Sequence, residues 1–153
     1  MKIGIISDTH NYFDPRLPDL FKGVRHIVHG GDVGTVVILF QLEEIAPVTA
    51  VLGNTDIGID LKPTELAVLG GRKIIVHHAV DPRELHDDLK KRIEQEKPDV
   101  VVFGHTHKPF CQIIGGVLYF NPGYAGKSRF GMDRSVAILE WDKKGIRPQF
   151  LPL

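Results

Sequence analysis

A short apolar segment that ends abruptly in a polar, metal-competent residue recurs along this chain. The run from Lys2 to Ile6 is apolar from Ile3 onward and leads into Asp8 and His10, and residues 26–29 lead through two glycines into Asp32. Short apolar runs bounded by glycine and polar residues are typical of buried strands. Because α/β proteins gather their sites at the carboxyl ends of strands, the pattern predicts an α/β domain with a site at those ends.

Between these segments and after them, sequence patterns typical of helices alternate with patterns typical of strands. A parallel connection needs a crossover element, so we predict a helix over residues 36–45 between two strands. Asp81 to Glu84 has the N-cap, the first-turn proline and the acidic third position of a helix start. We expect that helix to place Leu85, Leu89 and Ile93 on one face and to end before Pro98. Further strands are predicted over 48–52 and 99–103, with hairpins around Gly70-Gly71, Gly115-Gly116 and 143–145.

Size and composition bound the classes of protein that fit. With 153 residues, 42% hydrophobic and 25% charged, the chain suits one globular domain over residues 1–153. Lysine plus arginine and aspartate plus glutamate both number 19, so no overall positive charge favours nucleic acid or a membrane surface. Cys111 is the single cysteine and no apolar run is long enough for a leader or a membrane span. We therefore expect a cytoplasmic protein that binds neither nucleic acid nor membrane.

Five predicted strand ends carry carboxylate, amide or imidazole side chains that could meet in one site. Mixed nitrogen and oxygen donors suit Mn, Fe, Co or Zn better than Ca. Seven donors are too many for one ion and fit two, which lie about 3.5 to 4 Å apart in such sites and acidify a shared water. Paired cations neutralise a reacting phosphate, so phosphate esters are the expected substrates. The seven candidate ligands are Asp8, His10, Asp32, Asn54, His77, His105 and His107.

Two pairs of candidate ligands are separated by a single residue. Asp8 and His10 form one pair, and His105 and His107 form the other. Alternate residues of an extended segment point to the same side. We therefore expect each pair to aim two ligand atoms at one region from an extended backbone.

The ordered set of blocks resembles the signature of calcineurin-like metallophosphoesterases. The matching blocks are Asp8-Thr9-His10, Gly31-Asp32, Gly53-Asn54-Thr55-Asp56, His77 and Gly104-His105-Thr106-His107. The short chain and the Asn121-Pro122-Gly123 segment are most similar to the small bacterial and archaeal phosphodiesterase branch, to which the retromer subunit Vps29 is also similar. The resemblance implies a two-sheet β-sandwich flanked by helices.

The resemblance also implies a role for each ligand. It places Asp8, His10 and His107 on one metal, Asn54, His77 and His105 on the other, and Asp32 between them. We expect Asn54, Asp32 and His105 to act in catalysis, with Asn54 also reaching a phosphate oxygen. The implied cofactors are two divalent ions, Mn first, with Zn, Fe, Ni, Co or Mg as alternatives. The implied partner is a small phosphodiester or monoester substrate, and a homo-oligomer is compatible with the sequence.

Two positions depart from the family pattern. Many members have a histidine after the asparagine that protonates the leaving group, whereas this chain has Thr55, which cannot act as a general acid near neutral pH. The branch commonly has His-Gly-His where this chain has His77-His78-Ala79. His77 aligns as the ligand, and His78 either replaces the missing histidine or occupies a loop.

Several alternatives remain open at the level of sequence. The chain could be a catalytically weak, Vps29-like interaction scaffold, although all seven ligand positions keep competent donors. A nuclease is disfavoured by the balanced charge. His29 is expected to be a buried or supporting histidine and His86 a solvated one. Asn121-Pro122-Gly123 is either a turn or a phosphate-binding segment, and residues 127–129 form a basic stretch that we expect to be a solvated loop.

Overall fold

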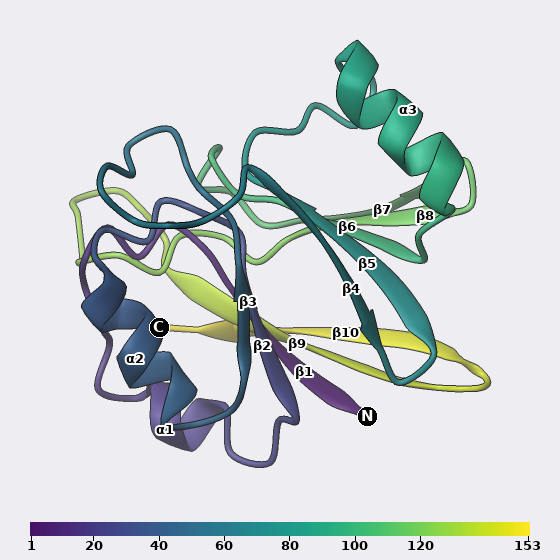
Figure 1. The fold of residues 1–153 in the computed structure, drawn as a ribbon. Coiled ribbons are helices and arrows are strands. Elements are labelled where there is room, and N and C mark those ends of the chain that lie inside the picture. The colour runs from purple at the N-terminus through teal and green to yellow at the C-terminus, as the bar shows by residue number, and fades with distance from the viewer.

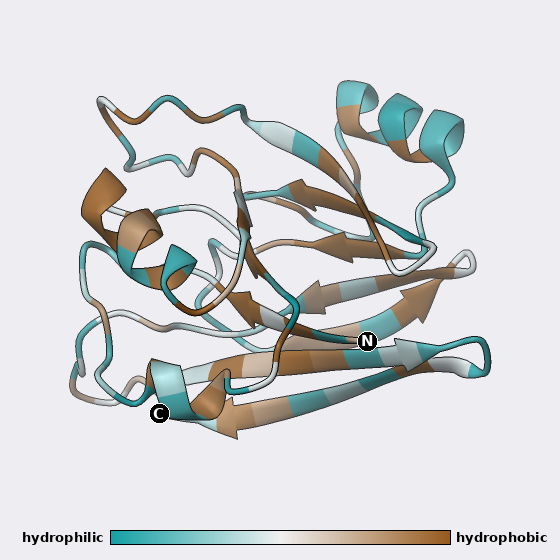
Figure 2. Ribbon diagram, turned by 60° about the horizontal axis from the view of Figure 1, so that its bottom comes forward, coloured by the Kyte–Doolittle hydropathy of each residue, from teal (hydrophilic) through white to brown (hydrophobic).

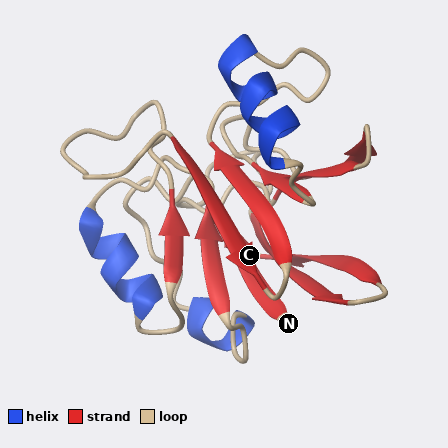
Figure 3. Cartoon of the chain, turned by 45° about the vertical axis from the view of Figure 1, so that its right-hand side comes forward, coloured by secondary structure: helices blue, strands red, loops and turns tan.

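The computed structural model describes all residues from Met1 to Leu153 and contains two five-stranded sheets packed face to face (Figure 1). Helices lie on the outside of the sheets (Figure 3). This is the two-sheet sandwich flanked by helices that the resemblance implied. The first sheet contains, in spatial order, β10 (Gly145–Pro152), β9 (Ser135–Asp142), β1 (Lys2–Ile6), β2 (His26–His29) and β3 (Val48–Ala50). The second contains β4 (Thr64–Leu69), β5 (Arg72–His77), β6 (Val100–Val102), β8 (Val117–Asn121) and β7 (Phe110–Ile114).

Both sheets have the same arrangement of three parallel strands with antiparallel strands added, and this arrangement brings strand ends together. In the first sheet β1, β2 and β3 are parallel neighbours, and β9 and β10 add antiparallel strands at one side. In the second sheet β5, β6 and β8 are parallel neighbours, with β4 and β7 as antiparallel edges. Six parallel strands therefore release their chains into loops, and these loops gather at the left of Figure 1.

Residue alternation along β1 explains how both faces of the first sheet are covered. Ile3 and Ile5 are fully buried in the core between the sheets, whereas Ile6 packs on the opposite face. That outer face is covered by α1 (Leu17–Leu20) and α2 (Val36–Glu43). A side chain at Gly4 would meet the Phe21 ring at 3.1 Å, so glycine allows the α1 segment to lie close to the strand. Apolar colour follows the strands through the middle of the molecule in Figure 2.

The outer face of the second sheet is covered by α3 (Asp87–Glu96). Leu89 and Ile93 pack against Ile75 and Val101, and the opposite face of α3 is polar (Figure 2). The prediction that this helix starts near Asp81 is wrong. Residues 81–84 form a turn instead, in which the Glu84 amide bonds to the Asp81 carbonyl.

The N-terminus of α3 is set by His86. Its Nδ1 atom accepts a hydrogen bond of 3.3 Å from the Leu89 amide, which is the bond that an N-cap side chain makes. Leu85 therefore precedes the helix and packs beside the same core cluster. The helix ends before Lys97, whose φ of 49° is left-handed, so the predicted stop before Pro98 is confirmed.

The other predicted elements are confirmed, with ends shifted by at most a few residues. Residues 36–45 contain α2, and the hairpins around the three glycine-containing turns are present. The single-turn helix α1 was not predicted, and Pro18 lies in its first turn. The longest helix has ten residues, and no helix has the length and apolar character needed to cross a bilayer.

Candidate metal centre

The first ligand group forms where β1 and β6 end. Asp8 Oδ1 lies 3.8 Å from His10 Nε2 and 3.3 Å from His107 Nε2. The three donor atoms lie within 4.8 Å of one another, which is close enough to share one ion. Asp8 is fully buried, and the two imidazoles are partly exposed. The structure therefore brings together the three residues expected on the first metal.

The second ligand group adjoins the first and also uses Asp8. His78 Nε2 lies 3.2 Å from Asp32 Oδ2 and 3.9 Å from Asp8 Oδ1. Asp32 Oδ2 is in turn 3.7 Å from His10 Nε2. Both carboxylates thus lie between the His10 side and the His78 side of the cluster, as a ligand shared by two ions must.

Asn54 and His105 complete the second group. Asn54 Oδ1 lies 2.9 Å from His78 Nε2 and 3.0 Å from His105 Nδ1. Two imidazole nitrogens therefore converge on one amide oxygen. Six of the seven predicted ligands are gathered at this edge of the sandwich.

His77 is the predicted ligand that the structure does not bring to the cluster. Its Nδ1 atom lies 2.8 Å from Thr64 Oγ1, and its Nε2 atom is 3.4 Å from Nε2 of His86. The neighbouring His78 takes its place. Its buried ring is held by a contact of 2.7 Å between Nδ1 and the Gly30 carbonyl.

Strand alternation explains why His78 rather than His77 faces the centre. Ile74 and Val76 point into the core between the sheets, and Ile75 points toward α3. Successive residues of a strand face opposite sides, so His77 continues on the α3 side and meets the residue that caps α3. His78 follows on the inner side. This parity was present in the sequence and would have identified His78.

The backbone at the centre is not extended, contrary to the expectation for the two spaced pairs. Seven non-glycine residues have positive φ, and six of them lie in these loops. Such conformations cost on the order of 1–3 kcal/mol each and persist where surrounding structure imposes them. They are concentrated where side chains must be aimed precisely. The six are Asp8 (56°), His10 (44°), Asn11 (64°), Asp32 (54°), His105 (69°) and His107 (62°).

Each of the two carboxylates has one oxygen held by the protein. Asp8 Oδ2 accepts hydrogen bonds from Ser7 Oγ at 2.7 Å and from the His105 amide at 3.1 Å. Asp32 Oδ1 accepts one from the Thr55 amide at 2.9 Å. A Cβ atom at Gly104 would overlap the Ser7 and Asp8 side chains, so glycine is required for this close approach.

The donor atoms that form no hydrogen bond within the protein are suited to bind a metal. Asp8 Oδ1 and His10 Nε2 are buried side-chain atoms without a hydrogen-bond partner. Buried polar atoms are otherwise almost always paired, and leaving them unpaired costs about 1–3 kcal/mol each. Both atoms point into the donor cluster, where a cation would satisfy them. Mixed imidazole, carboxylate and amide donors suit a borderline divalent metal.

Electrostatics distinguish the two carboxyl groups. Burial raises the pKa of Asp8. Burial also acts to raise the pKa of Asp32, but hydrogen bonds from Thr55 and the nearby histidines outweigh it and lower the pKa. Burial lowers the pKa of His107, which keeps its imidazole neutral and available as a ligand. A cation beside Asp8 would act against this effect of burial and favour the ionised carboxylate.

A second layer of polar residues fixes the loops behind the ligands. His29 is fully buried and its Nδ1 accepts from the Gly31 amide at 3.1 Å, so its Nε2 carries the proton and donates to Thr9 Oγ1 at 2.9 Å. Thr9 in turn donates to the Val33 carbonyl at 2.8 Å. His29 is therefore the supporting histidine that was expected and not a ligand.

Asp56 and Asn121 are structural residues of the centre. The Asp56 carboxylate accepts hydrogen bonds from the amides of Val33, Gly34 and Gly53 at 3.2, 3.0 and 2.8 Å. The Asn121 side-chain amide donates to the Gly104 carbonyl at 2.9 Å and is fully buried. Asn121 thus supports the His105 loop. The role of Asp56 had no signal in the sequence beyond its place in the family block.

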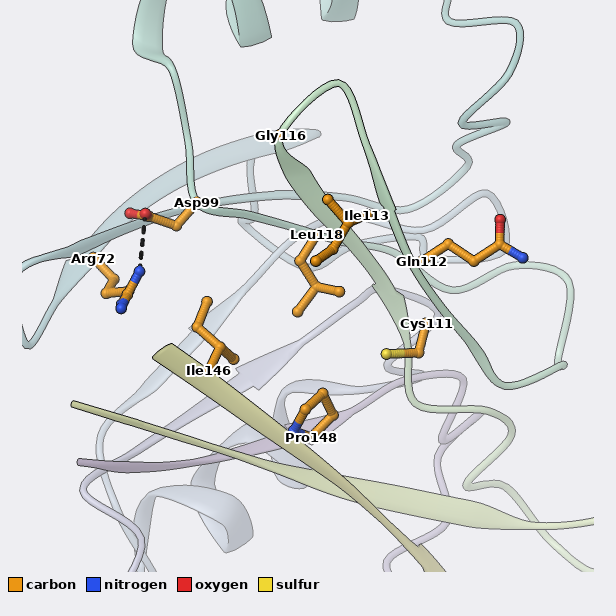
Figure 4. Close-up of a pocket in the computed structure, with 9 residues that line it drawn as sticks. All are labelled: Arg72, Asp99, Cys111, Gln112, Ile113, Gly116, Leu118, Ile146 and Pro148. Atoms are coloured by element: carbon orange, nitrogen blue, oxygen red, sulfur yellow. Dashed lines mark hydrogen bonds and ion pairs between the residues drawn. The ribbon is translucent and has the colours of Figure 1, made fainter. Parts of the chain in front are cut away.

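Several cavities open along the sandwich, and one of them adjoins the centre. A cavity of about 350 Å³ is lined by residues of the 79–89 segment and by His105 and Thr106. A larger one of about 560 Å³ opens between the β7–β8 hairpin and β10, with the Arg72–Asp99 ion pair at one end (Figure 4). No candidate ligand lines the larger cavity. Its lining residues are Arg72, Asp99, Cys111, Gln112, Ile113, Gly116, Leu118, Ile146 and Pro148.

Known proteins share this sequence and fold. A "Probable metallophosphoesterase" of Methanothermobacter thermautotrophicus is 34% identical over 159 residues, covering 99% of this chain and 92% of the relative. "Phosphodiesterase MJ0936" of Methanocaldococcus jannaschii is 30% identical over 167 residues, covering 96% and 97%. The zinc-complexed Vps29 of Entamoeba histolytica superposes with a TM-score of 0.75 over 99% of each chain, and at 22% identity it shows the fold alone.

The family assignment rests on a match over most of the chain. Residues 1–144 match the model of the calcineurin-like phosphoesterase superfamily domain. That match includes every candidate ligand and both sheets up to the last hairpin. It agrees with the resemblance seen in the sequence blocks. The chain belongs to the calcineurin-like phosphoesterase superfamily.

Proposed function

We propose that this protein is a metal-dependent phosphoesterase that hydrolyses phosphodiester bonds at a two-metal centre. The observation that carries the proposal is the pair of adjoining donor groups that share Asp8. Its unpaired Oδ1 atom and the unpaired His10 Nε2 atom mark where cations would bind. The names of the phosphodiesterase relatives support the same reaction class.

The donor geometry supports a ligand set that differs from the sequence prediction at one position. In this proposal Asp8, His10 and His107 hold one ion, and Asn54, His78 and His105 hold the other. Asp32 lies between His10 and His78 and completes both sites. His78 replaces His77 because only the His78 ring reaches the cluster.

The protein residues would have separate tasks in hydrolysis. Two bound divalent cations supply charge neutralisation at the phosphate and acidify water. The rigid loops orient their ligands. The Ser7 hydroxyl and the Thr55 amide donate hydrogen bonds to the carboxylate oxygens of Asp8 and Asp32 that do not face the donor cluster. Asn54, which meets two imidazoles at the exposed side of the centre, is placed to contact a phosphate oxygen. We propose Asn54, Asp32 and His105 as the catalytic residues.

Thr55 limits the range of leaving groups. A threonine hydroxyl does not donate a proton to a departing alkoxide near neutral pH. We expect aryl diesters to be hydrolysed much faster than dialkyl diesters, and the same order for monoesters if they are accepted. Rates for a series of substituted phenyl esters check this, and a rate independent of the leaving-group pKa would contradict it.

The test of the proposed function is removal and restoration of metal. Chelator treatment should abolish hydrolysis of bis(p-nitrophenyl) phosphate, and Mn²⁺ should restore it, with Zn²⁺, Fe²⁺, Ni²⁺, Co²⁺ and Mg²⁺ compared in parallel. Asn54→Ala should lose the restored activity. Activity that persists in metal-free protein, or that survives in the Asn54 variant at full rate, would exclude this centre as its source.

An interaction scaffold is the second candidate function. The apolar cavity between β7–β8 and β10 is the observation that favours it, because partly exposed apolar side chains lie there away from the metal centre (Figure 4). The Vps29 likeness supports a shared fold. Protein that binds two metals, hydrolyses no ester in a broad panel and forms a stable complex through this cavity would favour the scaffold.

A further inference from the structure

A single arginine side chain lies beside the metal centre with its positive charge unpaired. The guanidinium carbon of Arg129 is 5.4 Å from the centroid of the Tyr124 ring, the geometry of a cation–π contact. The same ring lies 4.8 Å from the ring of His107 and 6.3 Å from that of His10. The Tyr124 ring thus neighbours both the Arg129 guanidinium and the rings of two candidate ligands of the first metal.

Tyr124 is a fixed platform for this arginine. It is 1% exposed, and its hydroxyl donates a hydrogen bond of 2.9 Å to the Lys127 carbonyl. Its backbone carbonyl accepts from the Ser135 amide at 2.9 Å. A guanidinium stacked on such a ring loses little further freedom when it binds a ligand.

Comparison with Arg134 shows that the charge of Arg129 is free. Arg134 also stacks on a tyrosine, but it forms an ion pair of 3.0 Å with Asp14 and donates to the Gly126 carbonyl at 2.6 Å. Arg134 therefore holds the loop in place. Arg129 is exposed and has no such carboxylate partner.

The charge of Arg129 lies near the centre. Its guanidinium is placed over the Tyr124 ring, and that ring is 4.8 Å from the ring of His107. Residues 127–129 are exposed, as expected for a solvated loop. Arg129 also lies over the Tyr124 ring, beside the first ligand group.

We propose that Arg129 is a specificity-determining residue that binds a second anionic group of the substrate, carried on the alcohol part next to the scissile phosphate. This inference rests on the proposed function. The guanidinium lies against the Tyr124 ring and not against a ligand donor atom, so we expect it to meet a neighbouring group of the substrate and not the phosphate between the metal ligands. The preferred substrates are phosphate esters whose alcohol bears a carboxylate or a further phosphate, which a guanidinium binds through paired hydrogen bonds.

Two phosphonates that differ only in a carboxylate test the proposal by binding alone. Calorimetric titration of Mn²⁺-loaded protein should show 3-phosphonopropionate binding more tightly than propylphosphonate, by on the order of fivefold for an exposed charge pair. Arg129→Gln should bring the ratio of the two dissociation constants close to one. Arg129→Lys should give an intermediate ratio, because lysine keeps the charge but not the planar fork.

Lys127→Gln is the matched control, since it removes one positive charge from the same loop. This variant should keep the wild-type ratio. Equal affinity of the two phosphonates for wild-type protein would overturn the proposal, and so would equal loss of preference in the Lys127 and Arg129 variants. Propylphosphonate is the internal reference, because general damage to the site weakens both ligands and leaves their ratio unchanged.

The two proposals fail in different ways. If the wild-type protein does not hydrolyse bis(p-nitrophenyl) phosphate with any metal, the proposed function fails. If it does, but ethyl p-nitrophenyl phosphate and its 2-carboxyethyl analogue have the same KM, the assignment of Arg129 fails alone. The expected result is a lower KM for the carboxyethyl ester with a similar kcat, and loss of that difference in Arg129→Gln.

Discussion

His77 and His78 are adjacent in sequence, yet the structure gives them different surroundings. His77 bonds to Thr64 and faces His86, whereas His78 lies against Asp8, Asp32 and Asn54. The family resemblance alone favoured His77 as the metal ligand. The alternation of buried residues along β5 favours His78, because one step along a strand reverses the side on which a side chain lies.

Substitution of each histidine separates the two assignments. His78→Ala should reduce metal affinity by at least 10- to 100-fold, the range seen even for residues that only support ligands. His77→Ala should change metal affinity little, because its ring makes no contact with the donor cluster. Calorimetric titration with Mn²⁺ measures both, and a larger loss in the His77 variant would contradict the assignment of His78.

His29 makes stability depend on pH. Burial holds its pKa at about 3 in the folded protein, against about 6.5 when unfolded. Between these values the unfolded chain binds a proton that the folded chain does not. The free energy of unfolding should therefore fall as pH drops from 6.5 toward 3, by up to about 1.4 kcal/mol per pH unit, and should be unaffected by this group above that window.

His29→Gln removes this titration while keeping a neutral donor and acceptor. The variant should be less stable near pH 7 because its hydrogen bonds to Thr9 and Gly31 are imperfect, by about 1–3 kcal/mol. Its stability should fall less steeply with acid. Urea unfolding of metal-free protein between about pH 7.5 and 4.5 measures both slopes, and parallel slopes would show that His29 does not titrate in this way.

At the scale of elements, the loop after β3 is tied to the loop after β2 by one carboxylate. Asp56 accepts three amide hydrogen bonds from Val33, Gly34 and Gly53. Asn54 lies between Gly53 and Asp56 in the chain, so its position depends on these three hydrogen bonds. The family block contained Asp56, but its role depends on contacts between segments that the sequence does not place together.

Asp56→Asn should loosen both loops. An asparagine keeps one acceptor oxygen and replaces the other with a donor, so at least one buried amide loses its partner at a cost of about 1–3 kcal/mol. Asp60→Asn is the control, because Asp60 is exposed in the same loop and should shift stability by less than about 0.5 kcal/mol. Urea unfolding compares the two, and faster hydrogen exchange at Gly34 and Gly53 should accompany the loss. Equal stability of both variants would refute the role of Asp56.

The sequence predicted the strands and α2 well but misplaced the start of α3. Apolar runs with glycine boundaries are set by local chemistry, and they marked β1, β2 and the hairpins. The Asp81-Pro82 signal also fits a turn, and His86 makes the cap because its ring reaches the Leu89 amide. A cap depends on geometry that several residue types can supply.

At the scale of the whole molecule, the sandwich explains how a site forms from residues 8 to 107. The rule for a single open sheet predicted that strand ends converge on one site. In the structure these ligands come from two sheets. β1, β2 and β3 supply Asp8, Asp32 and Asn54, and β5 and β6 lead to His78 and His105. The presence of two sheets was implied by the family resemblance and not by the apolar pattern, and neither assigned individual strands to a sheet.

The left-handed loops could not be predicted from residue types. Positive φ is uncommon outside glycine, and although Asp and His adopt it more often than most residues, their presence at positions 8, 10 and 107 is too weak a signal to predict it. The conformation is imposed by neighbours, since the Asp8 and His10 amides bond to the Gly31 and Asp32 carbonyls across the loops. The packed sandwich therefore supplies the free energy that holds the ligands in strained positions.

We propose that one two-metal centre is formed by Asp8, His10, Asp32, Asn54, His78, His105 and His107. Electron paramagnetic resonance of metal-free protein titrated with Mn²⁺ tests this assignment. We expect two ions per chain and the spectrum of an exchange-coupled manganese pair, because the two donor groups adjoin at Asp8 and Asp32 lies between them. A stoichiometry of one, or two ions that give only uncoupled spectra, would contradict it.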